Sequence, residues 1–120
     1  SAPLIDVKGL SAALADFATE RDWNQYHSPK NLVMALTGEV GELCEIFQWL
    51  SEEASRSVAT QPETATAVRE ELADVTLYLV RLASVLGVDL NEAVTHKLQK
   101  NAANYPVEKA HGSHKKYNKL

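Results

Sequence analysis

Four acidic residues with the chemistry to bind a cation occur in this chain as two pairs of equal spacing. Glu39 and Glu42 are three positions apart, and so are Glu71 and Asp74. Carboxylates three apart on a helix are neighbours that repel each other, and partial burial without a counter-charge adds a further cost. A divalent cation between the two pairs would relieve both effects, and oxygen ligands suit Mg²⁺ or Mn²⁺. The spacing therefore predicts one metal site formed by all four side chains.

The segments that carry the two pairs repeat one pattern. Residues 35–50 superpose on residues 67–82 when shifted by 32 positions, and the shift places Glu39 on Glu71 and Glu42 on Asp74. Apolar residues recur in both segments at the spacing of one helix stripe, which predicts two amphipathic helices with the acids on the flank of the stripe. Solvated helix acids are the alternative for any single pair, but two pairs at the same phase favour a metal site. The stripes are Leu36, Val40, Leu43, Phe47 and Leu50, and Val68, Leu72, Val75, Leu79 and Leu82.

Helix start and stop signals predict an all-α chain with four helices in antiparallel order, resembling a four-helix bundle. We expect one helical domain over residues 1–106 and a basic tail over residues 107–120. A polar connector or a short helical turn is expected over residues 51–61. The expected helices run from a cap at Asp6 to Asp22, from Pro29 after Ser28 to Leu50, from Pro62 to Leu86 before Gly87, and from Leu90 after Asp89 to Asn104.

Composition limits the classes of function. The chain has 120 residues and a net charge of −4, which argues against a binder of nucleic-acid polymers, since their affinity depends on Lys and Arg at phosphates. No apolar run approaches the roughly 18 residues typical of a membrane span. The single cysteine, Cys44, cannot form an intramolecular disulfide and is expected to be buried near the apolar arc. These features predict a cytoplasmic protein.

Further polar and aromatic residues have two interpretations each. Trp23, Trp49 and Tyr78 could pack in the core or stack on a flat heterocycle, with the last two beside the acids on their helices. Lys97 and Asn101 lie one helical turn apart and could hold phosphate oxygens or be solvated. Glu45 lies away from the apolar stripe, where it is solvated or orients a water molecule near the metal.

These residues resemble the all-α nucleoside triphosphate pyrophosphohydrolases related to MazG, and most closely the dCTP pyrophosphatase branch. The resemblance covers nearly the whole chain. It is carried by Gly38-Glu39-Val40-Gly41-Glu42 and the residues up to Trp49, by Glu70-Glu71-Leu72-Ala73-Asp74, and by the segments at 20–23, 27–32, 78–79, 97–101 and 105–106.

The resemblance implies hydrolysis of a deoxynucleoside triphosphate to the monophosphate and pyrophosphate. It implies Mg²⁺ on the four acids and homo-oligomers, often tetramers, with sites near subunit contacts. The expected substrates are dCTP and 5-modified dCTP, in clearing the nucleotide pool. The base would stack near Trp23 and Trp49 with Tyr78 close by, phosphates would meet Lys97 and Asn101, and Tyr105 would reach a neighbouring site.

Two questions stay open at this point. Glu39 and Glu45 are both candidates for the carboxylate that takes a proton from the attacking water. The base preference is also open, because animal dCTP-specific enzymes carry a histidine where this chain has Leu14. Alternatives are the same reaction on dUTP or on an oxidised purine nucleotide, and a helical scaffold without catalysis.

Overall fold

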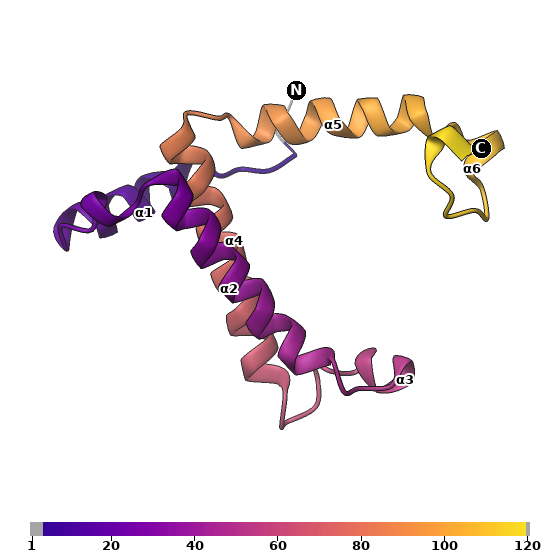
Figure 1. Ribbon diagram of the computed structural model, residues 1–120, viewed down its shortest axis with the longest axis horizontal. Helices are drawn as coiled ribbons and strands as arrows, with labels where there is room; N and C mark the ends of the chain where they lie inside the picture. Colours follow the sequence, from indigo (N-terminus) through magenta and orange to yellow (C-terminus); the bar gives the residue numbers. More distant parts are fainter. Residues whose placement is uncertain (1–3, 120) are drawn as a thin grey trace. The chain divides into compact units, whose positions relative to one another are not determined.

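The computed structural model describes residues 4–119, and all regular structure within this range is helical (Figure 1). This confirms the all-α prediction. The elements are α1 (Lys8–Glu20), η1 (Asn24–Tyr26), α2 (Pro29–Phe47), α3 (Glu52–Ser55), α4 (Ala65–Leu86), α5 (Leu90–Asn104), α6 (Val107–Ala110) and η2 (Tyr117–Lys119).

The described chain divides into two compact units, residues 7–88 and residues 4–6 with 89–119. The first unit contains α1 to α4, and the second contains α5 and α6. Within the second unit the Ile5 amide donates a hydrogen bond to Asn91 Oδ1 at 3.0 Å, which ties the amino-terminal segment to α5. The four-helix arrangement and the boundary between a domain at 1–106 and a tail at 107–120 stay predictions, and residues 1–3 and 120 lie outside the described range.

Local start and stop signals define α2, α4 and α5 where the sequence predicts them. Ser28 Oγ accepts the Asn31 amide at 3.2 Å, and Pro29 occupies the first turn of α2. Gly87 ends α4 with φ of 71°, a left-handed conformation that glycine adopts without a side-chain clash. Asp89 Oδ1 accepts the Glu92 amide at 3.0 Å and begins α5 at Leu90.

Four helix ends differ from the sequence-based expectation, one of them the end of α1 at Glu20, two residues before Asp22. α1 begins at Lys8 after Val7, so Asp6 is not its N-cap residue. α4 begins at Ala65 and not at Pro62, because the Thr64 hydroxyl donates to the Val58 carbonyl at 2.6 Å and holds the preceding residues in a turn. α2 ends at Phe47, three residues before Leu50, and the expected short helical turn follows as α3. Cys44 is exposed, contrary to the expected burial.

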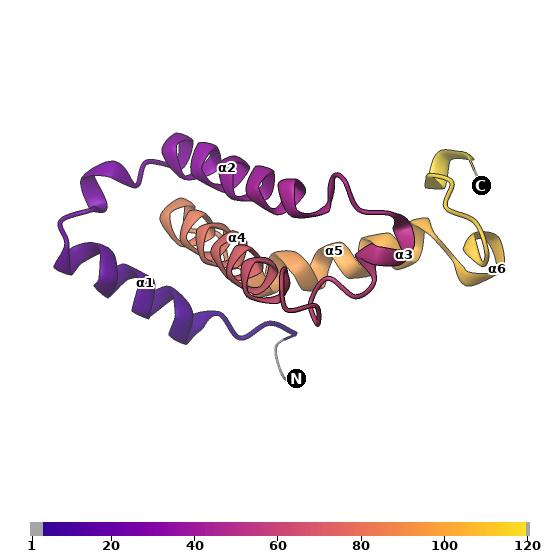
Figure 2. The same cartoon turned by 90° about the horizontal axis from the view of Figure 1, so that it is seen from below.

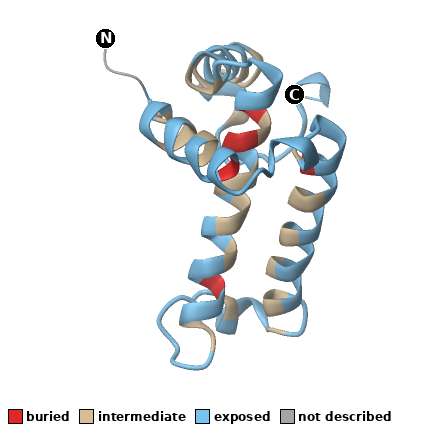
Figure 3. Ribbon diagram, turned by 90° about the vertical axis from the view of Figure 1, so that its left-hand side faces the viewer, coloured by how far each residue is buried: buried red, intermediate tan, exposed pale blue. Residues whose placement is uncertain are grey.

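The unit of residues 7–88 is built on α2 and α4, which run in opposite directions side by side, with α1 against α4 (Figure 2). Few residues within it are buried, and most positions are partly or fully exposed (Figure 3). Three residues of the predicted stripes, Val40, Leu72 and Leu79, keep 42%, 51% and 42% of their surface exposed. The buried apolar residues are Ala18, Leu32, Val58, Val68, Val80 and Ala83.

No helix within residues 4–119 combines the length and the apolar character needed to cross a membrane.

Candidate active site

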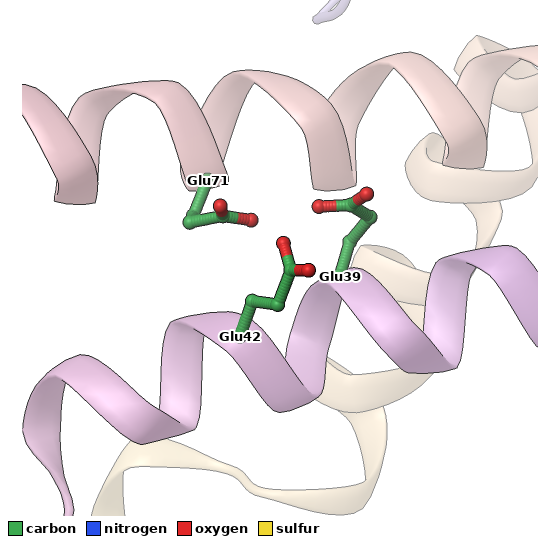
Figure 4. Close-up of side chains that lie close together, drawn as sticks. All are labelled: Glu39, Glu42 and Glu71. Carbon is green, nitrogen blue, oxygen red and sulfur yellow. The ribbon is translucent and has the colours of Figure 1, made fainter.

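Three of the four predicted metal ligands converge between α2 and α4. Glu39 and Glu42 project from α2 toward Glu71 of α4, and one carboxylate oxygen of each lies within 4.8 Å of the others (Figure 4). The three-residue spacing on α2 places its two acids on the same side of that helix. Close packing of α2 on α4 then brings the third acid opposite them. We name these three residues the carboxylate cluster.

Two oxygens of the carboxylate cluster are shielded from solvent and unsatisfied. Glu39 Oε2 and Glu71 Oε2 are buried, and neither has a hydrogen-bond partner within the described residues. Ionised carboxylates only accept hydrogen bonds, so the two groups satisfy each other only if one of them carries a proton. Buried, unpaired acceptors of this kind are costly, and a cation would satisfy both. The donor set therefore fits a hard divalent metal ion.

The crowding of negative charge changes the protonation of the cluster. Protonated Glu71 can donate a hydrogen bond to the Glu39 carboxylate, and this bond, burial and the nearby Glu42 raise the pKa of Glu71 to about 7 from its ordinary value of 4.5. The pKa of Glu39 is also raised: its hydrogen bond with Glu71 lowers it, but burial and the charges of Glu42 and Asp74 together raise it by more. Without a cation, the cluster therefore retains a proton well above the usual carboxylate range.

The raised pKa of Glu71 predicts a pH-dependent stability for the metal-free protein. Between pH 4.5 and about 7 the folded state binds more protons than the unfolded state, so this group's contribution to the free energy of unfolding falls as pH rises. His27 has a lowered pKa and acts in the opposite direction, losing stability as pH falls. We therefore expect the melting temperature of wild type, relative to Glu71→Gln, to fall from about pH 5 to about pH 8 in chelator. A constant difference between the two proteins would contradict the raised pKa.

Asp74, the fourth predicted ligand, is not part of the carboxylate cluster. Its charge helps to raise the pKa of Glu39, so it acts on the cluster electrostatically. Its side chain lines an adjacent pocket instead. Glu45, the second candidate base, lies near the cluster: an open groove of about 460 Å³ is lined by Glu42, Glu45, Ile46, Ala67 and Glu71.

The pocket beside Asp74 has a volume of about 150 Å³ and a largely apolar wall. A cavity of about this size holds one benzene ring, so the pocket matches a single six-membered ring in size. Trp23 packs edge-to-face on Phe17 with 5.6 Å between ring centroids, and 44% of its surface stays exposed. We name this the ring pocket, and its lining residues are Leu14, Phe17, Trp23, His27, Asp74, Leu77, Tyr78 and Arg81.

The ring pocket contains two polar residues whose roles the sequence does not reveal. Arg81 and His27 are 54 positions apart and meet only because α4 packs against the turn that precedes α2. A weak signal exists for Arg81, since it follows Asp74 by seven residues and Tyr78 by three and so shares their face of the helix. His27 begins one of the segments that carry the family resemblance, but its spacing from the other site residues gives no signal.

A family comparison covers the acids of this site and part of the ring pocket. The model of the MazG-like family matches residues 35–120, which include the carboxylate cluster, Asp74 and Tyr78. The chain belongs to the MazG-like family. This assignment confirms the family resemblance and implies a divalent metal ion, which the carboxylate cluster could bind.

Named relatives of this MazG-like chain are similar over almost its whole length. Rat dCTP pyrophosphatase 1 is 51% identical over 117 residues, covering 98% of this chain and 67% of the relative. The human protein of the same name is 47% identical with the same two coverages. A crystal structure of a pyrophosphatase from Archaeoglobus fulgidus aligns with a TM-score of 0.76 and 40% identity, covering 83% of this chain and 92% of that one.

The remaining predicted site residues of the MazG-like chain are Trp49, Lys97, Asn101 and Tyr105. Trp49 follows the end of α2 with 88% of its surface exposed, so it is not a core residue of the described chain. Lys97 and Asn101 lie on α5 and Tyr105 directly follows it, all in the second unit. Tyr105 packs edge-to-face with Tyr117 at 6.1 Å. The substrate contacts expected of these four residues stay predictions.

Proposed function

We propose that this chain is a Mg²⁺-dependent nucleoside triphosphate pyrophosphohydrolase that converts dCTP and 5-modified dCTP to the monophosphate and pyrophosphate. Such an activity would remove unwanted nucleotides from the pool. The observation that carries the proposal is the carboxylate cluster with its two unsatisfied oxygens, next to a pocket of single-ring size. The relatives named dCTP pyrophosphatase 1 support the choice of substrate.

In this proposal Glu39, Glu42 and Glu71 hold the metal, and Asp74 joins them as ligand or as nearby charge. Mg²⁺ is the expected ion, and Mn²⁺ would fit the same oxygen ligands. When bound, the ion would neutralise triphosphate charge and lower the pKa of water. An acidic groove without a cation repels a triphosphate, so the same residues make nucleotide binding depend on the metal.

The attacking water needs a proton acceptor, and two carboxylates remain candidates. Glu39 belongs to the cluster, while Glu45 lines the groove beside Glu42 and is free to orient water. The protein's other task is to position the phosphates, because phosphoryl chemistry depends mainly on placement and charge stabilisation. Lys97 and Asn101 are the proposed phosphate contacts.

The ring pocket is the proposed site of the base. Its volume of about 150 Å³ favours a pyrimidine over a purine, which has two fused rings. Trp23 and Tyr78 line it and supply aromatic surface for the ring. Trp49 and Tyr105 are proposed to complete the base site in an oligomer, with Trp49 stacking from its exposed position after α2.

We also propose a homo-oligomer, a tetramer, in the cytoplasm. Three stripe residues, Val40, Leu72 and Leu79, remain about half-exposed, and a second copy would cover them. In such an assembly residues 1–106 would form one domain of a four-helix bundle type, followed by the basic tail. Light scattering coupled to size-exclusion chromatography measures the subunit number directly.

A substrate panel tests the proposed reaction. The protein is incubated with each dNTP, dUTP, 5-methyl-dCTP and an oxidised purine dNTP, with Mg²⁺ or with chelator, and products are separated by ion exchange. We expect dCTP and 5-methyl-dCTP to give the monophosphate and pyrophosphate only with Mg²⁺. A preference for dUTP or for the purine nucleotide would show that the proposed substrate is wrong. Release of orthophosphate would overturn the proposed reaction. No turnover of any nucleotide would favour a helical scaffold without catalysis.

A further inference from the structure

The side chain of Arg81 is buried, with 9% of its surface exposed, and it lies in the wall of the ring pocket. Its Nε donates to His27 Nδ1 at 3.0 Å, and its Nη2 donates to Asn24 Oδ1 at 2.8 Å. Among the described residues Arg81 donates to these two neutral groups and forms no ion pair with a carboxylate. A buried guanidinium without a carboxylate is costly, so stability alone is a weak reason for it.

The hydrogen bond from Arg81 determines the protonation state of the His27 ring. An imidazole nitrogen accepts a hydrogen bond only when it carries no proton, so Nδ1 is the acceptor and Nε2 carries the hydrogen of the neutral ring. Burial and the positive charge of Arg81 lower the pKa of His27, in agreement with a neutral side chain. His27 is therefore held in one orientation and in one protonation state.

Both partners of Arg81 belong to the short segment that follows Trp23. Asn24 begins η1, and His27 comes directly after it. The His27 ring also packs edge-to-face with the Trp23 ring, with 6.4 Å between centroids and 65° between planes. Trp23 is thus held between Phe17 of α1 and a histidine that Arg81 fixes to α4. One guanidinium links the aromatic wall of the ring pocket to the helix that carries Asp74 and Tyr78.

We propose that Arg81 is a positioning residue for base binding: through His27 and Asn24 it holds Trp23 in place as a wall of the ring pocket. The inference rests on the proposed function, because it assigns the ring pocket to the base of the nucleotide. Arg81 acts through other residues and does not need to touch the reacting phosphates. Its loss should therefore weaken recognition of the base and leave recognition of the polyphosphate unchanged.

The Arg81→Lys variant tests this separation. Lysine keeps the charge but is a point donor on a flexible stem, so it cannot reproduce the fork that binds two acceptors. We expect the KM for dCTP to rise roughly ten- to a hundredfold, as for misplaced binding groups, with kcat little changed. Inhibition by inorganic tripolyphosphate, which has no base, should keep its wild-type constant. An unchanged KM, or an equal weakening of tripolyphosphate, would overturn the proposal.

Variants of His27 test the route through which Arg81 acts. The amide oxygen of His27→Asn can accept a hydrogen bond near the position of Nδ1, whereas His27→Leu cannot accept one. We expect His27→Asn to keep a KM for dCTP close to wild type, and His27→Leu to resemble Arg81→Lys. If both variants lose base affinity equally, or neither does, the contact from Arg81 to Nδ1 is not what positions the wall.

Arg69→Lys is the matched control, since Arg69 lies on the same helix and donates to the Ala59 carbonyl away from the ring pocket. Circular dichroism of every variant checks folding. Binding of dCMP, measured by the quenching of tryptophan emission, separates the proposed reaction from the proposed role of Arg81. If wild type turns over no dNTP but binds dCMP, and Arg81→Lys does not bind dCMP, the proposed reaction is wrong and the positioning role of Arg81 stands. Absence of dCMP binding to wild type would overturn both.

Discussion

Replacing Glu71 with glutamine is expected to lower Mg²⁺-dependent turnover of dCTP by roughly 10²–10³-fold, the effect of removing a preorganised electrostatic group. Glu71 is the only cluster residue from α4, and its buried Oε2 is one of the two unsatisfied oxygens. Glutamine keeps the shape of the side chain but removes its charge, so the metal loses a negatively charged ligand. Steady-state kinetics over a range of Mg²⁺ concentrations measures the effect.

Glu70→Gln is the matched control for this substitution. Glu70 precedes Glu71 on the same helix, is exposed, and loses the same charge. We expect its turnover to stay near wild type and its Mg²⁺ dependence to be unchanged. Glu71→Gln should also melt at a higher temperature than wild type in chelator near neutral pH, because it relieves repulsion within the cluster. An equal loss of turnover in both variants, or no loss in either, would contradict the assignment of Glu71 as a metal ligand.

Removing the indole of Trp23 is expected to raise the KM for dCTP roughly ten- to a hundredfold, the range measured for a base that loses its aromatic partner. Trp23 lines the ring pocket and keeps 44% of its surface exposed, so its ring has free area for a base. The measurement is the KM of Trp23→Ala for dCTP, compared with its inhibition by inorganic tripolyphosphate.

Trp23→Phe is the control that keeps an aromatic surface at this position. We expect it to recover most of the affinity that Trp23→Ala loses, since a phenyl ring can still pack on Phe17 and on a base. If alanine and phenylalanine have the same effect, the role of Trp23 is structural and not one of base contact. If neither changes the KM, the ring pocket is not the base site.

Features that depend on short stretches of sequence could be predicted. The Ser28 cap, the Gly87 stop and the Asp89 cap each depend on residues within one helical turn, and all three are present. The expected cap at Asp6 is wrong, because α1 begins one residue later, after Val7. Propensity fixes where a helix can begin, but the surrounding contacts choose between adjacent positions.

The carboxylate cluster could be predicted in part, for a different reason. The repeat of 32 positions gives the same helical phase to both acid pairs, and packing of α2 on α4 then brings Glu39, Glu42 and Glu71 together. The phase does not fix how far one helix slides along the other, so it could not show that Asp74 lies beside the cluster and lines the ring pocket. Arg81 meets His27 across 54 positions, a contact that only the tertiary fold determines.

Glu39, Glu42 and Glu71 are proposed to share one divalent cation. Titration with Mn²⁺, followed by electron paramagnetic resonance of the free ion, tests it without any nucleotide. We expect wild type and Glu70→Gln to remove Mn²⁺ from solution at the same concentrations, and added Mg²⁺ to release it. Glu71→Gln should bind Mn²⁺ roughly ten- to a hundredfold more weakly or worse. Identical titrations of wild type and Glu71→Gln, or no binding to wild type, would contradict it.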